Sequence, residues 1–284
     1  MDPLLLFISN HFYMTATFTV FFGAIIGSFL NVIIYRYPIM LEREWASEHN
    51  ETPLKKETFN LCLPRSHCPH CKKNISWWMN IPLISFIFLR GKCFYCNTTI
   101  GLHYFLTEII SAIATLIVFL HFSLSLQAIE VLILTYGLIV LSFIDFKHRI
   151  LPDTIVYILL WLGLVVSTQH IFVDPTQAIF GAIIGYLFLW SIAQAYALLR
   201  KKEGLGLGDC KMLAMLGAWV GYAPLMSIVL CAAVLALLIT LLLLTFKKID
   251  TQSLIPFGPF IAIAGWATVI YGDFITQWIA SWLM

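Results

Sequence analysis

Long uninterrupted apolar runs dominate this sequence, and they leave few folds open to it. Several reach the length of about 20 residues that an α-helix needs to cross a bilayer. With 60% hydrophobic and 11% charged residues, and a mean hydropathy of +0.89, a chain of 284 residues cannot form a single soluble core. The runs predict an all-α polytopic membrane protein with about eight transmembrane helices. We expect these helices at residues 12–35, 103–122, 128–146, 153–172, 177–199, 209–223, 225–246 and 256–282.

The basic residues are distributed unevenly around these runs. If all eight helices cross, every Lys and Arg falls on one side of the membrane. Nine lie between Arg36 and Lys92, and the others are Lys147, Arg149, Arg200, Lys201, Lys202, Lys211, Lys247 and Lys248. The opposite loops, around residues 122–127, 172–177 and 222–224, contain none. Because cytoplasmic loops carry an excess of Lys and Arg, the basic side is expected to be cytoplasmic and both termini to lie on the other side.

Two aspartates interrupt the apolar runs on this cytoplasmic side. Asp209 directly follows Gly206-Leu207-Gly208, where a basic loop gives way to an apolar run, and Asp145 ends another run. Ionisable residues at membrane depth usually line a functional site, so we expect the two to be partners. The alternative is that both are boundary residues solvated by water and headgroups. A third aspartate, Asp153, follows Pro152 at a predicted helix start and is interpreted as a helix N-cap.

The first apolar run has the features of a retained and tightly packed helix. No small-residue cleavage site follows it, so it is not expected to be a removed signal. Gly23 and Gly27 form a small-residue face that allows another helix to approach closely, and Asn31 on the same face needs a polar partner. Pro38 is expected to end the helix. In the second run, Glu108 lies about one turn inside the membrane boundary and is expected to have a partner such as a backbone amide or an Arg.

The polar segment between the first two runs contains two C-x2-C pairs, Cys68/Cys71 and Cys93/Cys96. Their separation of 21 residues is one more than is usual for four-cysteine zinc sites. A cytoplasmic location disfavours disulfides, and four thiolates complete a closed tetrahedral site, so structural zinc is the favoured interpretation. A redox dithiol or an iron–sulfur cluster is the alternative, and a nearby histidine, His67 or His70, could replace a ligand.

The same segment is rich in glutamate before the cysteine pairs. The ordinary interpretation is a solvated loop, and the alternative is an acidic surface that binds the basic tail of a substrate. The residues are Glu42, Glu44, Glu48, Glu51 and Glu57.

Several motifs in a fixed order resemble the type IV prepilin peptidases of bacteria. They are Gly23 to Pro38, the paired cysteines, Asn80-Ile81-Pro82, Asp145 to Asp153, Gly206 to Asp209 and Ile255 to Pro259. The resemblance covers nearly the whole chain, and it implies a bifunctional enzyme of the bacterial inner membrane. One activity is an aspartyl endopeptidase that removes the leader of type IV prepilins and type II secretion pseudopilins. The other is an N-methyltransferase that uses S-adenosylmethionine to methylate the new N-terminus.

The resemblance also implies which residues act and how the chain divides. The catalytic aspartates map onto Asp145 and Asp209, and the position linked to methylation maps onto Gly91. The expected division is residues 1–37 for the first transmembrane helix, 38–102 for the cytoplasmic zinc domain and 103–284 for the intramembrane protease core. The expected cofactors are Zn²⁺ and S-adenosylmethionine, and the expected partners are prepilins, pseudopilins and the lipid bilayer, but no nucleic acid. The oligomeric state stays open.

Elementary electrostatics suggests roles for the two aspartates. Hydrolysis by a carboxylate pair needs one ionised member to activate water and one protonated member to polarise the scissile carbonyl. Asp209 is expected at a helix N-terminus, where the helix dipole favours a carboxylate, and Asp145 at a helix C-terminus, where it does not. This argument predicts Asp209 as the base and Asp145 as the acid.

Two other classes of protein share some of these features. A transporter could relay protons through intramembrane carboxylates, but broken helices near the midplane and an internal repeat would then be expected, and neither is evident in the sequence. A structural zinc-bearing subunit of a secretion assembly would keep the cysteines. It would not need two aspartates on one side of the membrane.

Overall fold

A computed structural model describes residues 12–48, 59–201, 204–246 and 255–283 of the protein. The chain divides into two compact units, Met1–Leu132 and Ile133–Met284. Within the described ranges every regular element is helical, and the only β-type pairing consists of two isolated bridges. The prediction of an all-α protein is therefore confirmed.

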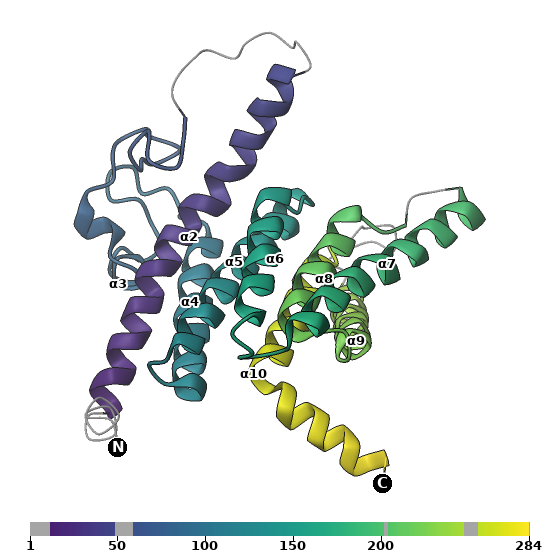
Figure 1. Ribbon diagram of the computed structural model, residues 1–284. Coiled ribbons are helices and arrows are strands. Elements are labelled where there is room, and N and C mark those ends of the chain that lie inside the picture. The colour runs from purple at the N-terminus through teal and green to yellow at the C-terminus, as the bar shows by residue number, and fades with distance from the viewer. Residues whose placement is uncertain (1–11, 49–58, 202–203, 247–254, 284) are drawn as a thin grey trace. The chain divides into compact units, whose positions relative to one another are not determined.

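The first unit is built on two long helices that pack side by side, as Figure 1 shows for α2 and α4. A side chain at Gly23 would place its Cβ 2.9 Å from the Ala112 Cα atom, and one at Gly27 would lie 2.8 Å from the Glu108 Cα atom. The Ser111 hydroxyl also donates a hydrogen bond of 2.7 Å to the Gly23 carbonyl. The predicted small-residue contact is thus confirmed. The elements of this unit are α2 (Phe12–Glu48), the 3-10 turn η1 (Trp77–Asn80), α3 (Ile84–Phe88), α4 (Leu102–Phe122) and the start of α5 (Leu126–His148).

The prediction that Pro38 ends the first helix is wrong, because α2 continues through it to Glu48. A proline inside a helix costs about 3 kcal/mol in lost hydrogen bonding and steric conflict. Tertiary contacts on both sides of it offset that cost. Arg36 is buried and donates hydrogen bonds to three backbone carbonyls of residues 60–64, and Arg43, one turn beyond the proline, lies over the Phe59 ring at 4.5 Å.

The extension of α2 changes the setting of the glutamates. Glu42, Glu44 and Glu48 are exposed, as expected, but they lie on a helix rather than in a loop. The remaining two, Glu51 and Glu57, lie outside the described residues.

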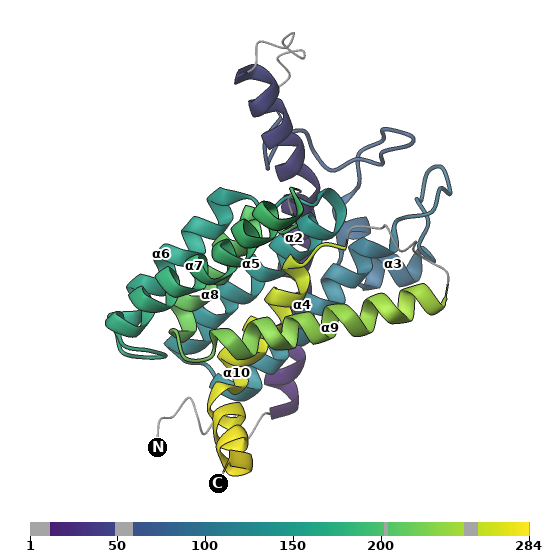
Figure 2. The same ribbon diagram turned by 90° about the vertical axis from the view of Figure 1, so that its right-hand side faces the viewer.

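The second unit is arranged around α8, the shortest of its helices. Ten of the eleven residues from Asp209 to Trp219 are buried, and Lys211 is the exception. Helix α7 approaches so closely that a Cβ at Gly181 would lie 2.2 Å from the Gly217 carbonyl oxygen. Figure 2 shows α6, α7 and α8 side by side. A helix that is apolar on all sides belongs in a core, which explains why this one is short. The complete elements of this unit are α6 (Asp153–Ser167), α7 (Pro175–Arg200), α8 (Leu207–Val220), α9 (Leu225–Thr245) and α10 (Gly258–Leu283).

A helix occupies each of the eight predicted positions, but the helices differ in their capacity to span a bilayer. Among the described residues, five are long and apolar enough to cross a membrane, namely α2, α4, α5, α7 and α9. Helix α6 has only 15 residues, and α10 has non-helical dihedral angles at Tyr271, so that its apolar first part is short. The positions of the helices are confirmed, and the count of eight crossings stays a prediction.

Candidate active site and metal centre

The two aspartates singled out in the sequence come together in the second unit. Asp145 lies in the last turn of α5, and Asp209 lies in the first turn of α8. Both are buried, with 6% and 9% of their surface exposed, and each lies within coulombic range of the other. Two buried carboxylates within coulombic range of each other disfavour simultaneous ionisation, and one ionised with one protonated carboxyl is the arrangement required for acid–base hydrolysis.

A backbone group that the sequence did not reveal completes the surroundings of Asp145. The N–H of Gly258, the first residue of α10, donates a hydrogen bond of 3.1 Å to the Asp145 Oδ2 atom. A Cβ atom at position 258 would lie only 2.6 Å from the same oxygen, so this close approach requires glycine. Gly258 belongs to the Ile255 to Pro259 motif, but no role for it followed from the motif alone.

The two glycines beside the carboxylates share a neighbour. A Cβ at Gly208 would lie 3.0 Å from the Leu151 Cβ atom, and one at Gly258 would lie 3.4 Å from the Leu151 Cδ2 atom. Leu151 therefore lies between the glycine that precedes Asp209 and the glycine that binds Asp145. This packing ties the loop after α5 to the starts of α8 and α10.

Asp153 does not act as the helix N-cap that the sequence suggested. It is the first residue of α6, and Pro152 occupies the cap position without a side-chain hydrogen bond. The Asp153 carboxylate instead binds the Lys211 ammonium group, with both oxygens within 2.8 Å of Nζ. The cause is tertiary: α8 places Lys211 beside the start of α6, and an ion pair outcompetes a local cap. Lys211 is thereby paired with Asp153, although it is two residues from Asp209.

The four predicted cysteines form one cluster in the first unit. The Sγ atoms of Cys68, Cys71, Cys93 and Cys96 all lie within 4.8 Å of one another, and those of Cys68 and Cys96 are 3.8 Å apart. Four sulfurs at the usual distance of about 2.3 Å from a zinc ion lie about 3.8 Å from each other. The cluster is therefore close to the size of a tetrahedral metal site, and a contraction of at most about 1 Å between sulfurs would complete it. His67 and His70 are not part of it.

Two matching turns present these cysteines. The Cys68 N–H donates to the Lys73 carbonyl at 3.0 Å, and the Cys93 N–H donates to the Thr98 carbonyl at 2.8 Å. An isolated β-bridge flanks each turn, His67 with Asn74 and Lys92 with Thr99. The sequence spacing is the same in both turns, so each C-x2-C pair folds in the same way. The separation of 21 residues is taken up by η1 and α3, which lie between the turns.

Hydrogen bonds lower the pKa of two of the thiols, Cys68 and Cys96. The backbone N–H of Cys71 is the main cause that lowers the pKa of Cys68. The Thr98 hydroxyl, 3.2 Å from the Cys96 Sγ atom, lowers the pKa of Cys96 to about 6. Because the thiolate is the form that binds metals, these contacts favour metal binding at neutral pH.

Gly91 lies where the backbone demands glycine. Its φ angle is +65°, which side chains rarely adopt, and an added Cβ would lie 3.0 Å from the Phe86 Cζ atom. Its N–H donates to the Phe86 carbonyl at 2.8 Å, and its carbonyl accepts from the Ile100 N–H at 2.7 Å. Gly91 therefore sets the direction of the backbone between the end of α3 and the second cysteine turn.

Asn31, which is buried, and Glu108, which is half-buried, have the kinds of partner that were expected. The Asn31 amide donates a hydrogen bond of 2.9 Å to the Tyr104 carbonyl. The Glu108 Oε2 atom accepts the backbone N–H of Leu83 at 2.8 Å. Both predictions are confirmed, and each contact joins a membrane helix to the start of α4 or to the segment before α3.

Comparison with known proteins gives a consistent picture. The profile of the bacterial peptidase A24 N-terminal domain matches residues 21–122, and that of the type IV leader peptidase family matches residues 132–241. A prepilin leader peptidase/N-methyltransferase of Stutzerimonas stutzeri is 45% identical over 259 residues, which cover 89% of this chain and 90% of the relative. Another protein of that name, from Pseudomonas aeruginosa, is 41% identical over 97% of both chains. No solved structure matches this chain significantly.

Proposed function

Since this chain belongs to the type IV leader peptidase family, we propose that it removes the leader of prepilins with Asp145 and Asp209 and methylates the new N-terminus. The family membership supports the two activities. The observation that supports the choice of residues is the buried, interacting pair of carboxylates at the facing ends of α5 and α8. A purely structural subunit would have no need of that pair.

The pair supplies both halves of amide hydrolysis. The ionised carboxylate takes a proton from water as the water oxygen bonds to the scissile carbonyl carbon, while the protonated carboxyl donates a hydrogen bond to the carbonyl oxygen. The C–N bond then breaks, and the leaving nitrogen receives a proton from the pair. Gly206, three residues before Asp209, leaves room for an extended substrate backbone, because a Cβ there would have no neighbour nearer than the Asp209 Oδ2 atom at 3.6 Å.

The geometry reverses the assignment of roles that helix dipoles alone suggested. A helix end favours or disfavours a carboxylate by about 0.3–1 kcal/mol. A hydrogen bond to a charged group contributes about 1.5–3 kcal/mol, and Asp145 receives one from Gly258. Gly258 also begins α10, so Asp145 lies at a helix N-terminus as well as at a C-terminus. We therefore assign the base to Asp145 and the acid to Asp209.

The four cysteines are proposed to hold a structural zinc ion. All four positions of the tetrahedron are filled by sulfur, so no position is left for water or substrate. The ion would stabilise residues 59–101, whose short turns offer little hydrophobic core of their own. It takes no part in cleavage, because the aspartates lie on other elements.

The methyltransferase depends on a methyl group that S-adenosylmethionine supplies when it is bound. The part of this chain proposed to serve it is the first unit, where Gly91 is the methylation-linked position. Gly91 supports this activity indirectly, through the backbone geometry that it permits and through its contact with Phe86.

The protein belongs to the inner membrane, and the finer topology follows from its charges. The distribution of the basic residues supports a topology in which the aspartates and the cysteines lie on the cytoplasmic side and both termini in the periplasm. Prepilins, and by the same chemistry the pseudopilins of type II secretion, would then be cut as their basic leaders reach that face. The functional division into residues 1–37, 38–102 and 103–284 is proposed alongside the two compact units, which separate at residue 132.

One experiment tests both activities. The protein is co-expressed with a single type IV prepilin in cells that lack their own processing enzyme, and the pilin is analysed by intact-mass and N-terminal mass spectrometry. We expect loss of the leader and a mass increase of one methyl group on the new N-terminal residue. A prepilin that remains uncut, with the protein present in the membrane, would refute the assignment.

A further inference from the structure

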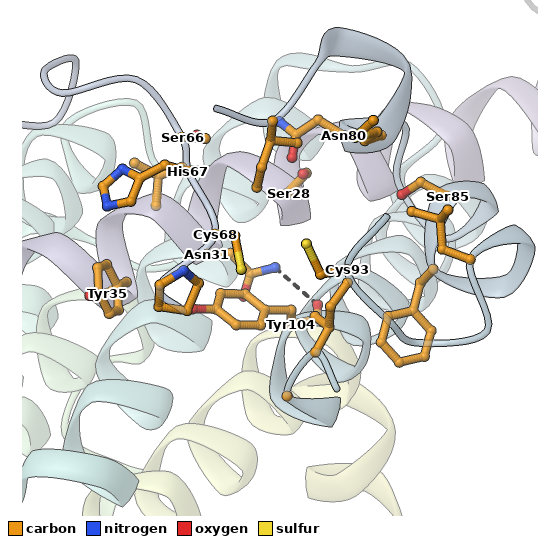
Figure 3. Close-up of a pocket in the computed structure, with 18 of the residues that line it drawn as sticks. Ser28, Asn31, Tyr35, Ser66, His67, Cys68, Asn80, Ser85, Cys93 and Tyr104 are labelled. Carbon is orange, nitrogen blue, oxygen red and sulfur yellow. Dashed lines mark hydrogen bonds between the residues drawn. The ribbon is translucent and has the colours of Figure 1, made fainter. Parts of the chain in front are cut away.

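The first unit contains a cavity of about 340 Å³ that none of the roles above uses. Figure 3 shows side chains from several elements converging on it: Ser28 and Asn31 from α2, Ser85 from α3, Tyr104 from α4 and Cys68 and Cys93 from the metal cluster. Small-molecule sites occupy about 300–1,000 Å³ and combine apolar walls with a few placed polar groups. In volume this cavity lies within that range.

The walls of the cavity are mainly apolar and include several aromatic rings. Phe86 and Phe105 stack with ring centres 4.7 Å apart and planes at 18°, and both line the space together with Tyr104 and Phe94. Aromatic faces accept flat heterocycles by stacking and attract cations through the negative charge of the ring face. A ligand that is at once aromatic and cationic would therefore use these walls fully.

Among the described residues, the charged groups that line the cavity are the Glu108 carboxylate and the Arg36 guanidinium, and the latter donates its hydrogen bonds to three backbone carbonyls. The Glu108 carboxylate is anchored by the Leu83 N–H at 2.8 Å. A carboxylate fixed among aromatic rings supplies negative charge in a mostly apolar space, which a cationic ligand can offset.

The backbone that Glu108 holds is strained. Leu83 has φ +61° and ψ −51°, and the Ile84 N–H donates to the Pro82 carbonyl at 2.6 Å, which together form a γ-turn of the rare kind with a positive central φ. A non-glycine residue in such a conformation costs of order 1–3 kcal/mol, and such strain concentrates at functional sites. The turn places Asn80 on one side of the cavity and Ser85 on another (Figure 3).

We propose that this cavity binds S-adenosylmethionine, the methyl donor. The inference rests on the proposed methyltransferase and gives that activity a location. The donor carries an adenine ring, a sulfonium cation and a net positive charge, and the cavity offers stacked aromatic rings, one carboxylate and the polar side chains of Asn80 and Ser85. No glycine-rich nucleotide loop is needed, since the recognition is aromatic and electrostatic.

The four-cysteine cluster and Gly91 both shape this cavity. Cys68 and Cys93, one from each cysteine turn, form part of the cavity wall, and Phe86 connects the wall to Gly91. Removing the metal would therefore open the cavity. A change at Gly91 would displace Phe86 into it. Both perturbations are expected to reduce donor binding without touching the aspartates.

The test is direct binding, measured by isothermal titration of the purified full-length protein with S-adenosylmethionine and with its neutral product S-adenosylhomocysteine. Ser85→Trp places an indole inside the cavity. The matched control Ile84→Trp places the same ring on the neighbouring residue of α3, which is 57% exposed and does not line the cavity. We expect Ser85→Trp to weaken donor binding at least tenfold and Ile84→Trp to leave it unchanged, with zinc content equal in both.

A second variant tests the carboxylate without relying on steric filling. Glu108→Gln keeps an oxygen that accepts the Leu83 N–H but removes the charge, and it should weaken S-adenosylmethionine about tenfold and S-adenosylhomocysteine less. Glu44→Gln on the exposed end of α2 is the charge control. Unchanged donor affinity in both Ser85→Trp and Glu108→Gln would overturn the proposal while wild-type methylation still stood. If these two variants bound the donor normally but had a raised KM for the cleaved pilin, the proposal would also be overturned. The cavity would then bind the methyl acceptor instead of the donor. If the wild-type protein neither bound the donor nor methylated, the methyltransferase itself would fail.

Discussion

Gly258→Ala should strongly reduce the rate of prepilin cleavage, although it adds only one methyl group. The added Cβ would lie 2.6 Å from the Asp145 Oδ2 atom, whereas ordinary contacts begin near 3.4 Å, so the carboxylate and the start of α10 must separate by about 0.8 Å. That shift also lengthens the 3.1 Å hydrogen bond from the Gly258 N–H. A misplacement of about 1 Å in a catalytic group can cost about a hundredfold in rate, and losing a hydrogen bond to a charged group costs about 1.5–3 kcal/mol.

We therefore expect kcat for prepilin cleavage to fall roughly 10- to 100-fold in Gly258→Ala, with a smaller change in KM because the added methyl group displaces Asp145 rather than a substrate-binding group. The assay is cleavage of a purified prepilin by the purified enzyme in detergent. Gly272→Ala is the matched control, because it lies in the same helix and its added Cβ would meet only the Thr268 Cγ2 atom at 4.0 Å. Wild-type kcat in Gly258→Ala, or an equal loss in Gly272→Ala, would refute the reasoning.

Three further outcomes are expected. The purified protein should carry one zinc ion per chain. Cys71→Ser and Cys93→Ser should each lose the ion and make the cysteine turns sensitive to protease, and methylation should fall more than cleavage. Metal analysis without zinc, or an iron–sulfur absorption spectrum, would contradict this. Neutralising the five glutamates of residues 42–57 together should raise KM for prepilin at low ionic strength and less at high salt, and an equal KM under both conditions would return them to a merely solvated role. In difference infrared spectra, the protonated-carboxyl band should disappear in Asp209→Asn and persist in Asp145→Asn; the opposite pattern would restore the roles that helix dipoles alone predict.

The features that sequence predicted well are those that depend on local pattern. Apolar length located all eight helices, and the small residues Gly23 and Gly27 located a close helix contact. The repeated C-x2-C spacing was enough to find the four-cysteine cluster, since each pair forms its own turn. Asp145 and Asp209 stood out because an ionisable residue within an apolar run is energetically costly and usually has a functional role.

The features that sequence missed depend on partners far along the chain. Gly258 binds Asp145 across 113 residues, and nothing near either residue indicates that contact. The ion pair between Asp153 and Lys211 likewise joins two helices, and it displaced a plausible local cap. Pro38 was misjudged because contacts made by Arg36 and Arg43 outweigh its intrinsic preference. The cavity beside the metal cluster is assembled from four elements and has no sequence signature of its own.

The central claim is that Asp145 and Asp209 form the catalytic pair, and the most direct measurement is prepilin processing by their amide variants. Asp145→Asn and Asp209→Asn each remove one half of the shared-proton arrangement, so cleavage should fall by at least a hundredfold while both proteins insert at wild-type levels. Asp153→Asn, which alters an exposed ion pair, is the matched control and should stay within a fewfold of wild type. Intact-mass spectrometry of the co-expressed prepilin should find it uncut with either of the first two variants. Wild-type cleavage in Asp145→Asn or in Asp209→Asn would contradict the account.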